Sequence, residues 1–202
     1  MEQPHTERAR VDDALRRRII VLVGLMGAGK TSVGRRLAAA LDLPFKDGDD
    51  EVEAAAGLTV PEIFALYGEE RFRDGERRVM QRLLTGEPCV LATGGGAFMD
   101  PITRMTIQQK AVSVWLKADI DVLVKRVARK DTRPLLSGKD PKQVLQDLAA
   151  IREPIYALAD IVVESGERAH AATVDAIIAA LKERMARKPT DASPDDETGA
   201  PI

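Results

Sequence analysis

The amino-acid sequence predicts a layered α/β fold built on a parallel sheet. Short apolar runs alternate with helical segments along most of the 202 residues, which is the pattern of βαβ units. The first run, residues 19–23, is continuously apolar and mostly β-branched, as expected of a strand that is buried on both faces. A glycine-rich turn joins this run to the first long helix.

The remaining elements follow from apolar periodicity and from helix-end signals. We expect strands over residues 19–23, 45–47, 89–92, 111–116 and 161–163. We expect helices over residues 31–41, 49–56, 59–66, 69–84, 101–109, 119–127, 141–157 and 169–185. Thr59 and Glu62 have the spacing of a capping box, with Pro61 in the first turn, and Gly57 ends the helix before it.

The chain divides into one domain and two flanking segments. Residues 18–186 form the predicted domain, and residues 1–17 form a polar N-terminal extension. Residues 187–202 are rich in Pro, Asp and Thr and carry an excess of acids, so we expect a disordered acidic tail. Within the domain, residues 128–140 are charged and contain Pro134 and Gly138, which is typical of a lid that closes over a site.

Composition argues against several classes of protein. The formal net charge is −2, from 30 basic and 32 acidic side chains, so no electrostatic footprint for nucleic acid or an anionic membrane is present. Aromatic residues make up 3% of the chain, too few for a base-stacking platform. The longest early apolar stretch is too short to span a bilayer, and the polar N-terminus lacks the apolar region of a signal peptide. We therefore expect a cytoplasmic protein that contacts neither nucleic acid nor membrane.

Cysteine and histidine usage argues against a disulfide and a zinc site. Cys89 is the single cysteine, and His5 and His170 are the only histidines. Because Cys89 opens an apolar run, we expect a buried structural thiol.

Residues 24–31 match the phosphate-binding loop pattern G-x-x-x-x-G-K-[ST] at every position. The match also lies between a predicted strand and a predicted helix, where the mechanism requires it. Its glycines let backbone N–H groups face phosphate, Lys30 neutralises charge on the β- and γ-phosphates, and the hydroxyl of Thr31 can coordinate Mg²⁺. A chance glycine-rich turn would not combine these features, so we predict a kinase that uses ATP.

Two carboxylates follow the second strand. Asp47 and Asp49 are two residues apart and would share a face if the backbone is extended, while Asp50 would point away. One carboxylate could then serve the Mg²⁺ shell and the other the acceptor hydroxyl. The alternative is a purely local role, with Asp49 capping a helix and Asp47 forming a turn.

Further candidates lie after the third strand and on the helices. Three glycines, 94–96, would let the backbone approach a ligand closely at a strand end. Glu76 lies three residues after Arg73 and could fix its guanidinium to meet an anion, whereas Arg71 is expected to be a surface residue. We expect Tyr156, late in a helix that Pro154 should kink, to be a core residue.

These elements together resemble the shikimate kinase family, a member of the nucleoside-monophosphate-kinase-like P-loop group. The resemblance covers about residues 19–181 and excludes the extension and the tail. It rests on residues 24–31, 47–49, 68–76, 94–96, 133–136 and 152–156, in this order and spacing. It implies a three-layer α/β/α P-loop NTPase fold with a five-stranded parallel sheet and a lid, and transfer of the γ-phosphoryl group of ATP to the 3-hydroxyl of shikimate.

The resemblance also implies how ATP and Mg²⁺ are bound. The implied phosphate-binding residues are Gly27, Ala28, Gly29, Lys30, Thr31 and Ser32. Lys30 stabilises the transferred group, Thr31 binds Mg²⁺, and Asp47 contacts the metal through water. Arg133 reaches the phosphates from the lid as a catalytic residue, while Arg126 and Arg168 border the adenine.

The resemblance also implies which residues bind the acceptor. Asp49 binds the acceptor hydroxyls and is the candidate base. Arg73 and Arg152 clamp the shikimate carboxylate, and Gly95 contacts the ring hydroxyls. We expect the enzyme to act as a monomer.

Three other functions fit the sequence less well. A gluconate kinase would share the loop and the lid, but paired arginines and a triple glycine suit a carboxylated ring better. A regulatory GTP-binding protein reads guanine with an Asn-Lys-x-Asp segment, which a chain without asparagine cannot supply. A catalytically dead binding protein is disfavoured because Lys30, Thr31, Asp47, Asp49 and Arg133 are all present.

Overall fold

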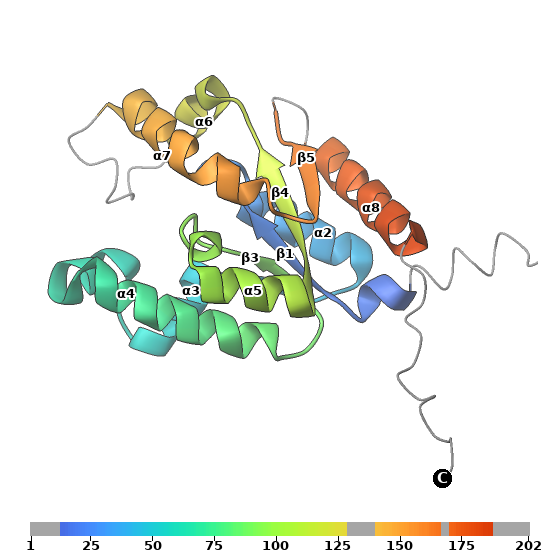
Figure 1. The fold of residues 1–202 in the computed structure, drawn as a ribbon, viewed down its shortest axis with the longest axis horizontal. Coiled ribbons are helices and arrows are strands. Elements are labelled where there is room, and N and C mark those ends of the chain that lie inside the picture. The colour runs from blue at the N-terminus through green and yellow to red at the C-terminus, as the bar shows by residue number, and fades with distance from the viewer. Residues whose placement is uncertain (1–12, 129–139, 167–169, 188–202) are drawn as a thin grey trace, which may run out of the picture.

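The computed structural model describes residues 13–128, 140–166 and 170–187 and shows one parallel sheet with helices on both faces (Figure 1). The sheet has five strands in the order β2-β3-β1-β4-β5. The strands are β1 (Ile19–Val23), β2 (Phe45–Asp47), β3 (Val90–Ala92), β4 (Ala111–Lys117) and β5 (Ile161–Glu164). The predicted fold class and all five predicted strands are confirmed.

Strand β1 is the centre of the sheet. Its residue Ile20 pairs with Val90 of β3 on one side and with Val112 of β4 on the other, and all five residues of β1 are buried. The sequence predicted a strand that is buried on both faces, and the burial of all five residues confirms this prediction.

The helices lie close to their predicted positions. They are α2 (Lys30–Leu41), α3 (Gly48–Ala56), α4 (Val60–Leu84), α5 (Pro101–Lys110), α6 (Ile120–Val127), α7 (Pro141–Tyr156) and α8 (His170–Arg187). Helix α4 joins the two helices expected there and is interrupted at Gly68, whose φ of 78° and ψ of 174° are not helical. The capping box of Thr59 and Glu62 is present at its start. A short 3-10 helix, η1 (Ala97–Met99), was not expected.

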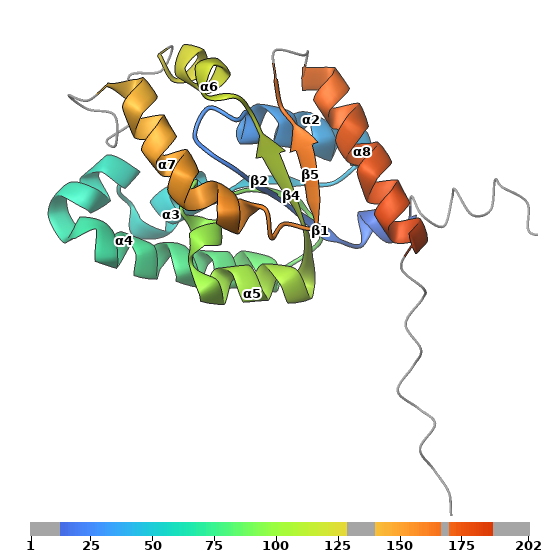
Figure 2. The same ribbon diagram turned by 45° about the horizontal axis from the view of Figure 1, so that its top comes forward.

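The helices form two layers. Helices α2 and α8 pack together on one face of the sheet, and α4, α5 and α7 lie on the other (Figures 1 and 2). The α7 helix continues through Pro154 to Tyr156, which is fully buried as predicted. Cys89 is also buried, as predicted.

The layering creates a switch point in the sheet between β1 and β3. Strand β1 leads into α2 on one face, whereas the neighbouring strand β3 leads through η1 into α5 on the other. In open α/β sheets, ligands bind beyond the carboxyl ends of strands at such a point. The loop of residues 24–29 and the glycines 94–96 follow these two strands, so the fold brings both motifs to one place.

The N-terminal segment contributes to the core. Residues 13–16 are helical, and Leu15 is fully buried. The backbone N–H of Arg18 donates to the Leu15 carbonyl at 3.1 Å, which ends this turn just before β1. The polar extension predicted for residues 1–17 thus contains one core residue among those that the structure describes.

Several predicted features fall outside the described residues. They are residues 1–12 of the extension, residues 129–139 of the lid with Arg133, Arg168 in the segment 167–169, and residues 188–202 of the tail. Within the described ranges, none of the helices combines the length and the apolar character needed to cross a membrane.

Candidate active site

The phosphate-binding loop takes a conformation that its glycines make possible. Gly24, Gly27 and Gly29 have φ values of 139°, 84° and 94°, a region that residues with a Cβ rarely adopt. Space is also limited, because a Cβ on Gly27 would lie 3.0 Å from a side-chain methyl of Val127. Gly29 is the N-cap of α2, so the loop leads directly into the N-terminus of a helix of 12 residues. A helix N-terminus with a tightly curved loop before it offers N–H groups to an anion.

Lys30 lies folded against this loop. Its ammonium group donates to the carbonyl of Gly24 at 2.8 Å and to that of Leu25 at 3.0 Å. These contacts keep the charge of Lys30 at the loop that is predicted to bind phosphate.

Asp47 connects the phosphate-binding loop to the end of β2. Its Oδ2 accepts a hydrogen bond of 2.8 Å from the hydroxyl of Thr31, and its Oδ1 accepts one of 3.1 Å from the backbone N–H of Asp49. Asp47 is therefore the N-cap of α3. The extended backbone assumed from the sequence ends at Asp47, because helix α3 begins at Gly48, but the two carboxylates still lie close together.

The carboxyl group of Asp49 has a raised pKa. It remains accessible to solvent, yet many protein atoms surround it, and this partial loss of hydration raises the pKa most. The negative charge of Asp47 raises the pKa further, while Lys30 lowers it. A carboxyl group with a raised pKa is a better proton acceptor than an ordinary one, as general base catalysis requires.

The glycines 94–96 leave room for side chains that come from three helices. A Cβ on Gly94 would lie 2.6 Å from Oδ1 of Asp49 and 2.7 Å from Oε1 of Glu76. A Cβ on Gly95 would lie 3.0 Å from a guanidinium nitrogen of Arg152. Real Cβ atoms almost never come within 3.0 Å of another group, so a side chain at position 94 would have to displace these carboxylates.

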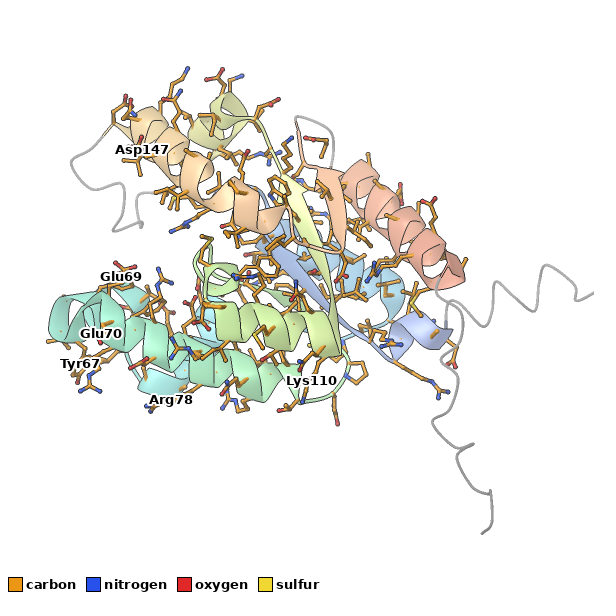
Figure 3. All side chains as sticks on the ribbon, viewed as in Figure 1. Tyr67, Glu69, Glu70, Arg78, Lys110 and Asp147 are labelled. Atoms are coloured by element: carbon orange, nitrogen blue, oxygen red, sulfur yellow. The ribbon has the colours of Figure 1, made fainter. Side chains whose placement is uncertain are left out.

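Arg73 is held in place by two acids of its own helix. Its guanidinium donates to Glu76 at 2.7 Å and to Glu69 at 3.1 Å. Figure 3 shows Glu69 on α4, where it directly follows the interruption at Gly68. Glu76 is buried, and burial raises the pKa of its carboxyl group against the opposing charge of Arg73. The interpretation that Glu76 fixes Arg73 is confirmed, and Arg71 is exposed as expected.

Arg152 and Tyr156 reach the glycine segment from α7. Both donate to the carbonyl of Gly95, the guanidinium of Arg152 at 3.1 Å and the hydroxyl of Tyr156 at 2.5 Å. They lie one helical turn apart, so their side chains project from the same face of α7. Burial raises the pKa of Tyr156 to about 12, so the phenol keeps its proton and remains a donor at neutral pH.

The two motif segments lie next to each other. A Cβ on Gly95 would stand 3.7 Å from the carbonyl oxygen of Gly24 in the phosphate-binding loop. Asp49 and Arg152 contact the glycine segment from α3 and α7, and Lys30 contacts Gly24 from α2. One compact site therefore combines an anion-binding loop, a carboxyl group of raised pKa and two guanidinium groups.

Arg126 and Ser165 both donate hydrogen bonds to backbone carbonyls of the phosphate-binding loop. The guanidinium of Arg126 donates to the carbonyls of Gly27 at 3.2 Å and Gly166 at 2.5 Å. The hydroxyl of Ser165 donates to the carbonyl of Ala28 at 2.8 Å. The loop is thus joined to α6 and to the segment after β5.

Comparison with known proteins identifies the family. The family model described as shikimate kinase matches residues 26–182, which is most of the chain. A shikimate kinase of Caulobacter vibrioides is 60% identical over 172 residues, covering 85% of this chain and 86% of that protein. The chain belongs to the shikimate kinase family. The family predicted from the sequence is therefore confirmed.

Solved structures agree with this assignment. A shikimate kinase from Acinetobacter baumannii, solved in complex with shikimate, has a TM-score of 0.82 and 37% identity, covering 86% of this chain and 98% of that chain. A gluconokinase from Sinorhizobium meliloti has a TM-score of 0.56 and 22% identity, covering 85% of this chain and 94% of that chain. The second likeness shows a shared fold alone, so the gluconate kinase alternative gains no support beyond the fold.

The residues present fit the Mg²⁺ ion that kinases of this type use with ATP. Magnesium prefers oxygen ligands and takes only one or two from the protein, with phosphates and waters as the rest. The hydroxyl of Thr31 and the carboxylate of Asp47 are such ligands, and they lie within a hydrogen bond of each other beside the loop. Among the residues that the structure describes, no cluster of three His, Cys, Asp or Glu side chains could hold a metal ion.

The structure brings most of the predicted site residues together. Lys30, Asp47 and Asp49 lie around one space with Arg73, Gly95 and Arg152. Arg126 contacts the carbonyl groups of the phosphate-binding loop. Its contact with adenine stays a prediction, as do the roles of Arg133 and Arg168. Sequence reasoning missed Ser165 and the contact of Tyr156 with Gly95. The position of Ser165 directly after the last strand was a usable signal.

Proposed function

We propose that this protein transfers the γ-phosphoryl group of ATP to the 3-hydroxyl of shikimate, giving shikimate 3-phosphate and ADP. One observation carries the choice of acceptor: Arg73 and Arg152, from different helices, converge on the glycine segment beside the phosphate-binding loop. The relative from Acinetobacter baumannii, whose structure contains shikimate, supports the same acceptor.

The two arginines suit a ligand that carries a carboxylate on a ring. A guanidinium offers parallel N–H donors that match the two oxygens of a carboxylate. Glu69 and Glu76 fix the orientation of Arg73, and the carbonyl of Gly95 fixes that of Arg152. A clamp that is already ordered loses little conformational entropy when the acceptor binds.

Asp49 is proposed to receive the proton of the attacking hydroxyl. Its raised pKa makes the carboxylate more basic, and the charges of both Lys30 and Arg73 are near enough to act on it, which supports this role. The hydroxyl oxygen forms the new bond to the γ-phosphorus, the bond from that phosphorus to the β,γ-bridging oxygen breaks, and ADP leaves. The proton passes to the Asp49 carboxylate.

Lys30 and the loop N–H groups stabilise the charge that spreads over the transferred group. In phosphoryl transfer the protein contributes mainly through positioning and through charges that are already oriented. Thr31, and Asp47 through water, would hold Mg²⁺, which would neutralise further phosphate charge. Arg133 would add a cation from the predicted lid.

The deciding experiment is a coupled ADP-release assay with a panel of acceptors. The panel contains shikimate, quinate, gluconate and nucleoside monophosphates. We expect turnover with shikimate to exceed that with every other acceptor by at least about 100-fold in kcat/KM, roughly 2.7 kcal/mol. Phosphorus NMR of the product should show the new phosphate ester on the 3-hydroxyl. Faster turnover of gluconate or of a nucleotide would show the assignment to be wrong.

We also propose that the protein acts as a monomer in the cytoplasm. One chain brings Lys30, Asp47 and Arg152 to the candidate site, which supports a site that lies within a single subunit. Light scattering coupled to size-exclusion chromatography tests the monomer, with the expected mass being that of the 22.0 kDa chain.

A further inference from the structure

Ser165 holds a carbonyl group of the phosphate-binding loop from outside the site. It directly follows β5, and its side chain is 3% exposed. Its hydroxyl donates to the carbonyl of Ala28 at 2.8 Å, although 137 positions separate the two residues. The backbone N–H of Ser165 donates to the carbonyl of Lys117 at 2.5 Å, so β4 holds the serine itself in place.

This contact fixes the orientation of one peptide group of the loop. The peptide bond between Ala28 and Gly29 is planar and trans, so its N–H points opposite to its carbonyl. With the carbonyl of Ala28 directed outward to Ser165, the N–H of Gly29 is directed away from Ser165. Gly29, with its φ of 94°, has unusual freedom to rotate this peptide, so an external contact is needed to restrict it.

Arg126 contacts the same part of the loop, but it differs from Ser165 in being partly exposed. Its Nη1 lies 3.2 Å from the carbonyl oxygen of Gly27, 3.5 Å from that of Ala28 and 3.4 Å from that of Ser165. Its side chain is only partly buried, so a nucleotide could contact it directly. Ser165 is enclosed and its hydroxyl donates to Ala28, so the hydroxyl group acts on nucleotide binding through the loop.

We propose that Ser165 is a positioning residue for nucleotide binding, whose hydroxyl holds the Ala28–Gly29 peptide with its N–H turned toward the phosphates. The proposal needs a phosphate-binding loop but no particular acceptor, so it stands apart from the assignment of shikimate. It predicts that loss of the hydroxyl weakens nucleotide binding without changing the affinity for the acceptor.

The test compares Ser165→Ala with a matched control, Ser113→Ala. Ser113 is also a fully buried serine at the sheet, and its hydroxyl donates to Asp160 at 2.8 Å, remote from the loop. Titration calorimetry with ADP and Mg²⁺, without acceptor, gives the affinity of each full-length variant. We expect Ser165→Ala to raise the Kd for ADP about fivefold, the effect of losing one hydrogen bond to a neutral group, and Ser113→Ala to leave it within about twofold of wild type.

Steady-state kinetics provides a second readout. Ser165→Ala should raise the KM for ATP and leave the KM for the acceptor unchanged. If this variant does not fold, Ser165→Cys replaces it, because a thiol fills the same space but is a weak donor. An ADP affinity within about twofold of wild type for the variant that folds, or an equal loss of affinity in Ser113→Ala, overturns the proposal.

Discussion

The guanidinium of Arg73 occupies the space that a side chain on residue 96 would need. A Cβ built on Gly96 would lie 2.6 Å from the Cζ atom of Arg73, well inside van der Waals contact. The backbone of Gly96 has φ −96° and ψ −19°, which any residue can adopt. Space, and not backbone conformation, therefore explains this glycine.

Gly96→Ala should displace Arg73 and weaken acceptor binding. The clash falls on the end of a flexible side chain, so we expect the fold to persist while the guanidinium moves. The KM for shikimate should rise about tenfold, equivalent to roughly 1.4 kcal/mol, with little change in the KM for ATP. Gly75→Ala is the matched control. Gly75 lies on the same helix as Arg73, and a Cβ there would meet nothing within 4 Å. Wild-type kinetics in Gly96→Ala would contradict the proposed position of the acceptor.

Replacing either clamp arginine by lysine should keep the charge but lose the orientation. We expect Arg73→Lys and Arg152→Lys each to raise the KM for shikimate by about tenfold or more, because an ammonium lacks the paired donors of a guanidinium. A decrease in kcat should accompany this change, since a tilted ring moves its hydroxyl out of line with the γ-phosphate. Steady-state kinetics with each substrate varied in turn decides the matter. Damage confined to the KM for ATP would refute the clamp.

Lys30→Met should abolish phosphoryl transfer while leaving the fold intact. The ammonium group of Lys30 donates to the loop carbonyls of Gly24 and Leu25, and water at this partly buried position can replace it as their donor. The loss of charge at the transition state should cost several kcal/mol, on the order of a thousandfold in rate. Activity is measured by ADP release and folding by circular dichroism. Activity within about tenfold of wild type would exclude the assigned role of the loop lysine.

Asp100 should make stability depend on pH. Burial raises the pKa of this carboxyl group, but hydrogen bonds from Arg77 and Thr103 outweigh burial and leave the pKa below its usual value. A carboxyl group whose pKa is lowered by folding stabilises the folded state above its unfolded pKa, about 3.9, and this contribution is lost as the pH falls through the folded pKa. Asp100→Asn keeps one side-chain oxygen that can accept the N-cap hydrogen bond of α5, and it removes the charge together with the second acceptor oxygen that Arg77 uses. Its melting temperature should lie below that of wild type at about pH 7, and the difference should shrink as the pH falls below about 4. A difference that is constant with pH would rule out this account.

Local sequence patterns predicted most of the fold because each element carries its own signal. Residues 19–23 indicate a buried strand through their apolar run, and Thr59 marks a helix start through its capping box. The phosphate-binding loop is equally local, since its glycines, Lys30 and Thr31 lie within eight positions of one another. The right-handed rule for βαβ connections then limits the arrangements that these strands can take, and the structure gives the strand order.

The reasons for the glycines 94–96 could not be predicted, because they depend on residues far away in the sequence. The sequence indicated close approach of a ligand, whereas the structure shows that Asp49, Glu76, Arg73 and Arg152 also need this space. The contact of Ser165 with Ala28 is equally long-range. The burial of Leu15 was not predicted for a different reason: the apolar pattern around it is only a few residues long and is flanked by charged residues, although Leu15 is fully buried.

The burial of Leu15 decides where the chain can be shortened. A version that begins at Arg18 would retain every strand and every predicted site residue, yet it would lack a side chain that belongs to the hydrophobic core. Burying a leucine contributes about 2 kcal/mol, and the cavity left by its loss adds to that cost. Trimming for crystallisation or for fusion to another protein should therefore keep Leu15.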